Sequence, residues 1–133
     1  MIVEISQQTQ FDKVPGLKAE WERTKPLIIE ALKYDELYEI DDVECKIREG
    51  TFLLWTGKQS AMITEIIEFP RKKTCNLLFC GGDYKELVKI TETIEEFCRL
   101  SGITKIFGGG RRGWLRKIKH LGWKNEFLIS KDL

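Results

Sequence analysis

The chain has 133 residues, of which 42% are hydrophobic, and this length is enough to bury the core of one domain. Charged residues make up 32% of the sequence but nearly cancel to a formal net charge of +1, which excludes an overall preference for polyanions or membrane surfaces. No segment approaches the roughly 20 consecutive apolar residues of a membrane-spanning helix, and the first residues lack the character of a signal peptide. Because there is no candidate linker and no internal repeat, we expect a single domain over residues 1–133.

The cysteines and the single histidine do not form a metal-binding pattern. Cys45, Cys75, Cys80 and Cys98 lie in apolar surroundings without C-x-x-C spacing, and the only histidine is His120. We therefore expect no metal site. Free buried thiols suit a reducing compartment, so we predict a cytoplasmic protein.

The first part of the chain is predicted to be mainly helical. Residues 2–5 alternate apolar and polar side chains, which indicates a short strand. Residues 9–24 have the apolar spacing of a helix, and a second helix is expected to begin near Pro26, because proline is tolerated in a first turn. Acidic residues at positions 41, 42 and 44 favour a further helix start, and Gly50 favours its end.

The pattern then changes to that of strands. Residues 51–56, 60–69 and 74–80 are rich in β-forming side chains and are separated by Gly57-Lys58 and by residues 70–73. Two short turns predict an antiparallel meander, whose third strand leads into the glycine pair Gly81-Gly82.

Two helix starts follow this meander, each after an apolar run that ends in glycines. Asp83 and Glu86 have the spacing of a capping box, and the helix that follows is expected to stop at Gly102. A strand over residues 103–107, the glycines 108–110, a helix stopped by Gly122 and a last strand over residues 124–130 complete the chain. This order predicts an α+β fold with αβα layers and a mixed sheet. The strand ending at Cys80 and the strand 103–107 should be parallel neighbours that diverge at their C-terminal ends.

Positive charge is concentrated at the C-terminal end. Residues 103–133 hold eight Lys and Arg against Glu126 and Asp132, which leaves a net charge of about −5 for residues 1–102. Two of the cations fall in a first helical turn, where they oppose the helix dipole unless an anion or an acidic partner faces them. We predict an anion-binding or partner-binding surface formed by Arg111, Arg112, Arg116, Lys117 and Lys119.

The order of elements resembles that of the GNAT acyl-CoA N-acyltransferase superfamily over nearly the whole chain. The ending from Gly113 to Trp123 is similar to the last helix of that family and to the Gly-Phe pair that stops it. The chain looks most like small, divergent GNAT-like proteins encoded among phage head and tail genes, in which an acidic-capped Gly-Gly turn and a Gly-Arg-x-Gly-Trp run recur. The resemblance implies a GNAT-like mixed sheet with a splayed parallel pair, and acetyl-CoA as the acyl donor.

The chain departs from that family at the diphosphate loop and at the general acid. If the central helices are aligned by their closing glycine, Lys85 and Leu87 occupy the positions of the two loop glycines, and Asp83 places a negative charge near the diphosphate. Ile118 stands where a tyrosine often serves as general acid, and one terminal strand is missing. These departures predict that acetyl-CoA binds weakly or not at all.

The resemblance also implies where the chemistry would take place. A backbone N–H of Phe79 or Cys80 would hold the thioester carbonyl. Glu65 or Glu68 would serve as the general base, but their different parity places them on opposite faces of a regular strand. The thiol of Cys80 has no evident histidine partner, which favours a buried core thiol. The predicted cofactor-binding residues are Phe79, Cys80, Gly81, Gly82, Asp83, Gly109 and Gly110.

Three hypotheses of function follow. The chain is an N-acetyltransferase that uses acetyl-CoA and an amine acceptor, or a non-catalytic GNAT-like protein, or a nucleic-acid-binding protein. In the second case it would be a phage morphogenesis or virion component that binds an acidic protein through the basic helix, or that forms a homo-oligomer. Nucleic acid is the least favoured partner, because the basic cluster is short and interleaved only with Trp114 and Trp123.

Replacing Arg111 and Arg112 together by Ala tests whether their positive charge faces acidic residues of the same chain or an outside partner. If the acidic segment 35–49 faces them, the double variant should lose roughly 0.5–1 kcal/mol of stability. If an outside partner faces them, stability should hold or rise slightly, while binding to the partner weakens and loses part of its salt dependence. Thermal melts and pull-downs measure the two effects, and a variant unchanged in both would show that the arginines are simply solvated.

Overall fold

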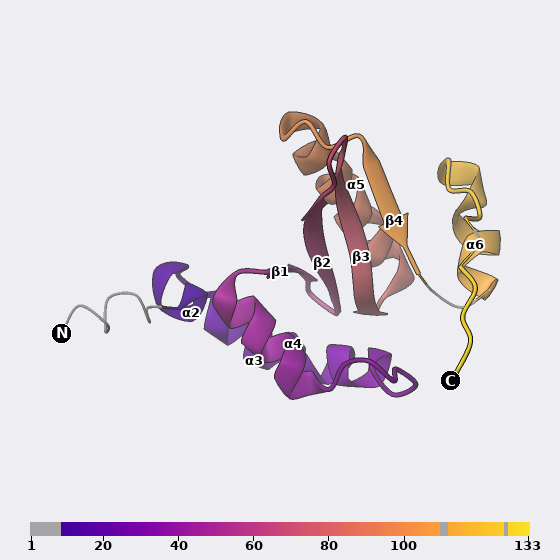
Figure 1. Cartoon of the computed structure of the whole chain (residues 1–133). Coiled ribbons are helices and arrows are strands. Elements are labelled where there is room, and N and C mark those ends of the chain that lie inside the picture. Colours follow the sequence, from indigo (N-terminus) through magenta and orange to yellow (C-terminus); the bar gives the residue numbers. More distant parts are fainter. Residues whose placement is uncertain (1–8, 110–111, 127) are drawn as a thin grey trace.

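The computed structural model describes residues 9–109, 112–126 and 128–133 (Figure 1). Its helices are α2 (Gln10–Lys13), α3 (Leu17–Ala31), α4 (Ile40–Glu49), α5 (Tyr84–Leu100), α6 (Arg112–Ile118) and the 3-10 helix η1 (Lys119–Leu121). Its strands are β1 (Phe52–Gly57), β2 (Ser60–Glu68), β3 (Lys73–Gly82) and β4 (Lys105–Gly108). The predicted strand over residues 2–5 lies outside the described residues.

The four strands form one mixed sheet in the order β1-β2-β3-β4. β1, β2 and β3 are antiparallel, and β4 is parallel to β3, so the predicted meander and parallel pair are confirmed. The β3–β4 pairing runs from Thr74↔Lys105 to Leu77↔Gly108, although β3 continues to Gly82. β4 thus ends opposite Leu77, and residues 78–82 of β3 have no paired strand on that side (Figure 1).

Helices cover both faces of the sheet, which confirms the αβα layers (Figure 1). On one face α3 packs mainly against β3 and β2 and α4 packs against β1, and on the other α5 packs against β1, β2 and β3. Burying these apolar side chains is the main favourable contribution to folding. The first core contains Trp21, Ile28, Leu32, Val43, Ile47, Phe52, Ala61 and Ile63. The second contains Met62, Cys75, Leu87, Ile90, Ile94, Cys98 and Ile103.

The helix boundaries near the N-terminus differ from the prediction. The expected helix over residues 9–24 is broken between α2 and α3, where Gly16 takes a left-handed φ of 80°. No new helix begins at Pro26, which lies inside α3 on its exposed side. The buried residues Trp21 and Ile28 flank this proline, and their packing outweighs the hydrogen bond that proline cannot donate.

The predicted last strand is wrong. The described residues 123–126 and 128–133 form neither helix nor strand, and the side chains of Leu128 and Ile129 are 94% and 91% exposed. A strand requires a neighbour for its backbone hydrogen bonds, and these residues form no backbone ladder with β4.

The prediction that Gly81 and Gly82 form a loop after the third strand is also wrong. Both belong to β3, where they pair with Ala61 and Ser60. Their lack of side chains allows close approach, since a Cβ on Gly81 would lie 2.6 Å from the carbonyl oxygen of Leu27 in α3. A Cβ on Gly82, whose φ is 110°, would collide with the carbonyl oxygen of Gln59.

Replacing Gly82 by Ala should therefore lower the stability by about 3 kcal/mol or more, since backbone strain adds to the steric collision. The matched control is Gly102→Ala, because Gly102 also has a positive φ, of 74°, but no atom lies within 4 Å of its added Cβ. That control should lose only about 1 to 2 kcal/mol. Chemical denaturation measures both, and equal losses would contradict the role given to close approach.

Candidate functional site

The site begins at a β-bulge in β3. The β2–β3 register changes from Ile63↔Phe79 to Thr64↔Leu77, so Leu78 is an extra residue on β3. As a result, Leu78 and Phe79 both pack on the face covered by α3 and α4, whereas Leu77 and Cys80 pack on the face covered by α5. The bulge follows directly after Leu77, the last residue of β3 that pairs with β4.

Alternation of backbone groups gives the direction of the amides beyond the bulge. The N–H of Asp83 donates to the carbonyl of Gln59 at 3.0 Å, on the β2 side of β3. Successive residues of a strand direct their N–H groups to opposite neighbours, so those of Gly81 and Phe79 also face β2. The N–H of Cys80 then faces the side on which β4 no longer pairs. We call this space, between residues 78–82 of β3 and the end of β4, the strand opening.

The two candidate bases lie at different distances from the strand opening. Cys80 pairs with Met62 on β2, and at about 3.3 Å per residue Glu65 is about 10 Å and Glu68 about 20 Å further along. Glu68 is at the opposite end of the hairpin, where it forms an ion pair with Lys73 at 3.2 Å. The structure therefore brings Glu65 closer than Glu68 but places neither beside Cys80.

The remaining predicted site residues differ in their burial, and some of them lie outside the described residues. Burial raises the pKa of the Cys80 thiol, in agreement with a core side chain and not with an activated nucleophile. Cys45, in contrast, is exposed, which corrects the expectation that all four thiols are buried. Gly109 follows β4 and is exposed. Gly110, Arg111 and the side chain of Arg112 lie outside the described residues.

Two carboxylates occupy the start of α5. Asp83 is the N-cap and accepts from the N–H of Glu86 at 3.0 Å. The predicted return bond from Glu86 to the Asp83 N–H is wrong, because the Glu86 carboxylate binds the β1–β2 turn instead. It accepts from the Ser60 hydroxyl at 2.6 Å and from the Gln59 N–H at 2.9 Å.

This arrangement does not fit the diphosphate of coenzyme A. A helix N-terminus attracts phosphate through free N–H groups, but here the Asp83 carboxylate already binds the N–H of Glu86. The pKa of the Glu86 carboxyl lies below its usual range, chiefly because of the Ser60 hydroxyl and then the Gln59 N–H, so this group stays charged at neutral pH.

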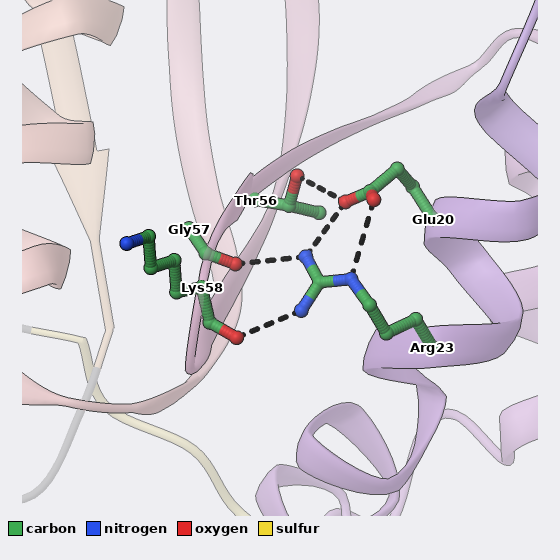
Figure 2. Close-up of a pocket in the computed structure, with 5 residues that line it drawn as sticks. All are labelled: Glu20, Arg23, Thr56, Gly57 and Lys58. Carbon is green, nitrogen blue, oxygen red and sulfur yellow. Dashed lines mark hydrogen bonds and ion pairs between the residues drawn. The ribbon is translucent and has the colours of Figure 1, made fainter.

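An arginine of α3 holds the other side of the same turn, beside an open hollow of about 560 Å³ (Figure 2). The guanidinium of Arg23 donates to the carbonyls of Gly57 and Lys58, each at 2.8 Å. It also forms an ion pair with Glu20 at 2.7 Å, and Glu20 accepts from the Thr56 hydroxyl at 2.8 Å. These two partners, first Arg23 and then Thr56, lower the pKa of Glu20. The donors of Arg23 are thus directed to the protein itself.

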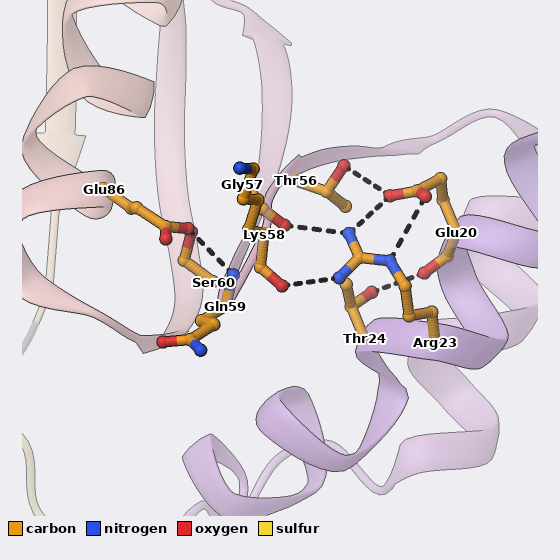
Figure 3. Close-up of polar contacts among 9 residues, drawn as sticks. All are labelled: Glu20, Arg23, Thr24, Thr56, Gly57, Lys58, Gln59, Ser60 and Glu86. Carbon is orange, nitrogen blue, oxygen red and sulfur yellow. Dashed lines mark hydrogen bonds and ion pairs between the residues drawn. The ribbon is translucent and has the colours of Figure 1, made fainter.

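The turn between β1 and β2 is held between α3 and α5, as Figure 3 shows. Its two-residue loop is Lys58-Gln59. Two-residue hairpin loops favour turns with positive φ, but no non-glycine residue in the described part of the chain has a positive φ. The turn is therefore of a less favoured type, and Arg23 and Glu86 stabilise it from opposite sides. The Asp-x-x-Glu spacing drew attention to Glu86, but nothing in the sequence indicated the carbonyl partners of Arg23.

A second hollow, of about 510 Å³, lies near the start of β4, at the end of that strand opposite to the strand opening. Its lining includes Cys98, Arg99, Ile103, Thr104, Leu121 and Trp123. Neither hollow is lined by residues 78–83 or 107–109, so neither coincides with the strand opening. The strand opening is the stronger candidate site, because it presents a backbone donor that the sheet does not use.

The basic helix α6 contacts the start of α5. The Lys117 ammonium lies 5.2 Å from the ring centre of Tyr84 and 5.9 Å from that of Trp114, and the Tyr84 hydroxyl donates to the Lys117 carbonyl at 3.2 Å. Arg116, Lys117 and Lys119 are exposed. No ion pair among the described residues neutralises these three cations, and none joins them to the acidic segment 35–49.

Two further findings concern the part of the chain that the structure describes. It contains no helix that is long and apolar enough to cross a membrane. Within the same residues, no three His, Cys, Asp or Glu side chains gather as metal ligands would.

No protein-family model and no curated protein matches the chain, but solved structures do. A probable acetyltransferase has a TM-score of 0.63 at 12% identity, covering 86% of this chain and 95% of the other. An acetyltransferase of Trypanosoma brucei has a TM-score of 0.64 at 13% identity, covering 87% and 94%. An aminoglycoside acetyltransferase from an uncultured soil metagenomic sample, solved with sisomicin, has a TM-score of 0.59 at 10% identity, covering 86% and 89%. The chain therefore shares its fold with acetyltransferases.

Replacing Glu86 by Gln should remove an acid-sensitive part of the stability. The folded-state pKa of Glu86 is lowered, so its contribution is present above the unfolded pKa of about 4.3 and is lost as pH falls through the folded value. Stability of the wild type and of Glu86→Gln should thus differ at pH 7 and converge below about pH 4. Urea denaturation across this range measures the difference.

Glu92→Gln, an exposed change on the same helix, is the control and should follow the wild-type curve. If the free energies of unfolding of the wild type and Glu86→Gln differed by the same amount at every pH, the charge of Glu86 would not be what stabilises the turn.

Proposed function

We propose that this chain transfers an acyl group from a thioester to an amine, with the acyl end bound in the strand opening. One observation carries the proposal: β4 ends opposite Leu77, just before the Leu78 bulge of β3, and the Cys80 N–H faces the side of β3 on which β4 no longer pairs. The fold shared with acetyltransferases supports it.

The residues of the strand opening have separable roles in such a transfer. A bound acyl thioester supplies the electrophilic carbonyl carbon. The Cys80 N–H donates to the carbonyl oxygen as that oxygen gains negative charge during attack by the amine, and a single preorganised donor of this kind contributes about 3 to 4 kcal/mol. Glu65, about 10 Å along β2 from the partner of Cys80, accepts the proton of the amine through a chain of waters. The departing thiolate takes a proton from solvent water, and Glu65 releases the amine's proton to solvent, so charge and atoms balance.

We also expect this chain to bind the acyl donor acetyl-CoA weakly. Asp83 and Glu86 place two carboxylates at the α5 N-terminus, where they repel a diphosphate. We expect a dissociation constant for acetyl-CoA above about 100 μM, which corresponds to roughly −5.5 kcal/mol. The acyl end and its contact with Cys80 then provide most of the recognition.

The second candidate is a non-catalytic binding protein, such as a phage morphogenesis or virion component, that uses α6. It is favoured by the exposed Arg116, Lys117 and Lys119, which have no acidic partner among the described residues. An acidic protein fits this surface better than nucleic acid, since Trp114 is half-buried against Tyr84 and is not free to stack on bases. Two results together would favour this function. The Arg116→Ala and Lys119→Ala variants would bind an acidic protein partner more weakly than the wild type, and the wild type would transfer no acyl group to any amine.

Replacing Asp83 by Asn should tighten acetyl-CoA binding by about five- to tenfold, which is about 1 to 1.4 kcal/mol. The change removes one negative charge beside the diphosphate, whereas the helix cap is kept because Asn and Asp cap equally well. Calorimetric titration of acetyl-CoA measures the affinity, and release of free thiol in the presence of amines measures transfer.

Asp35→Asn is the matched control, because Asp35 accepts from the N–H groups of Leu37 and Tyr38, at 2.7 Å each, in the loop before α4. It should leave the affinity unchanged. Micromolar binding by the wild type would show that the carboxylates do not weaken the site, and thiol release that no amine accelerates would argue against acyl transfer.

A further inference from the structure

The last part of the chain carries exposed positive charge. Five exposed Lys and Arg side chains follow β4 within the described residues: Arg116, Lys117, Lys119, Lys124 and Lys131. None of these side chains forms an ion pair among the described residues. Residues 112–133 contain only two acids, Asp132 and Glu126, and Glu126 is already paired with Lys105 of β4 at 3.2 Å. The formal charge of +1 for the whole chain therefore conceals a local positive surface.

Exposed apolar side chains lie in the same part of the chain. Leu128, Ile129 and Leu133 are 94%, 91% and 114% exposed, whereas the side chains of both cores are at most 9% exposed. Figure 1 shows the C-terminus and α6 on the same side of the molecule, beyond β4. Aliphatic side chains in water favour association with an apolar phase. We call these three side chains, together with the five cations, the C-terminal surface.

The two kinds of side chain together select the class of partner. Nucleic acid offers dense negative charge but no apolar region for Leu128, Ile129 and Leu133. An acidic protein meets the cations, but its charged surface leaves the same aliphatic side chains in water. An anionic bilayer offers both, because its headgroups carry negative charge and its acyl chains begin directly beneath them. Of these partners, the bilayer is the one that covers every member of the C-terminal surface.

We propose that the C-terminal surface binds the face of an anionic phospholipid bilayer. The Lys and Arg side chains then lie among the headgroups, and Leu128, Ile129 and Leu133 enter the boundary between headgroups and acyl chains. Each Lys or Arg near such a surface raises the partition coefficient by about fivefold, and stable attachment needs the apolar contact in addition. The chain lies on the bilayer in this mode, which requires no membrane-spanning helix. The proposal concerns where the chain acts, and it holds whether or not the chain transfers an acyl group.

Flotation of the full chain with lipid vesicles tests the proposal, because aggregated protein does not float. Vesicles of phosphatidylcholine with about 30% phosphatidylserine are compared with vesicles of phosphatidylcholine alone. The wild type should partition at least about tenfold more strongly to the anionic vesicles, and raising the salt from about 0.05 to about 0.5 M should remove most of this difference. Equal partition to both kinds of vesicle would overturn the proposal. Binding to soluble polyglutamate but to no vesicle would also overturn it, and would assign the cations to an acidic protein instead.

Two double variants test the apolar contact. Leu128→Asp with Ile129→Asp should weaken partition to the anionic vesicles by at least about tenfold and keep the wild-type melting curve, since both side chains are exposed. Leu37→Asp with Leu100→Asp is the matched control, because it adds the same two charges at leucines that are 84% and 81% exposed elsewhere in the chain. It should partition like the wild type. Equal losses in the two double variants would show that net charge alone causes the loss, and would contradict the apolar contact.

Two further double variants test the cations. Arg116→Ala with Lys119→Ala should weaken partition by roughly 10- to 30-fold, because two of the five cations are removed. Lys18→Ala with Lys72→Ala removes two exposed lysines elsewhere and should leave partition within about twofold of the wild type. Equal losses in both variants, or a loss in neither, would overturn the proposal. No acyl donor is present in these measurements, so their outcome does not depend on acyl transfer.

Discussion

The end of β4 opposite Leu77, while β3 continues to Gly82, is the constraint on which the candidate site depends. A continued parallel ladder would use the amides of β3 for sheet hydrogen bonds, and no donor would remain for a ligand. The extra residue Leu78 bends β3 at this point and directs both Leu78 and Phe79 to the core under α3 and α4. The N–H of Cys80 is thereby directed to the strand opening. A backbone donor placed in this way needs no special side chain, so the site can be present although the sequence around it is apolar.

The start of α5 serves the stability of the fold at the expense of anion binding. Glu86 and Arg23 hold the Lys58-Gln59 turn from opposite sides, and Asp83 caps the helix. Each contact satisfies a polar group that the turn or the helix would otherwise leave unpaired. The same carboxylates repel a diphosphate. Under the proposed function, the weak donor binding that we expect in a chain with the fold of acetyltransferases has one physical cause, the use of this helix end to anchor a hairpin.

Local pattern predicted those elements whose own residues specify them. The apolar stripe of α5, its Asp83 cap and the two turns of the meander are local features, and they were enough to predict the mixed sheet. Pro26 was misread because burial of Trp21 and Ile28 is a tertiary effect. Glycines needed for close approach look the same in sequence as glycines in a loop, so Gly81 and Gly82 were placed outside their strand. The prediction of a strand over 124–130 was wrong because a strand depends on a neighbouring strand that its own residues do not specify. The role of Arg23 was not predicted because its partners are backbone carbonyls, which no residue type in the sequence indicates.

The backbone amide of Cys80 gives the most direct test of the strand opening as an acyl site. Its ¹H–¹⁵N resonance can be followed while acetyl-CoA is added to millimolar concentration, with coenzyme A lacking the acetyl group as the comparison. We predict a downfield proton shift of Cys80 with acetyl-CoA that is larger than the shifts of Phe79 and Gly81, whose N–H groups face β2, and that is much smaller without the acetyl group. An unmoved Cys80 resonance, with changes confined to α6 or equal for the two compounds, would contradict acyl binding between β3 and β4.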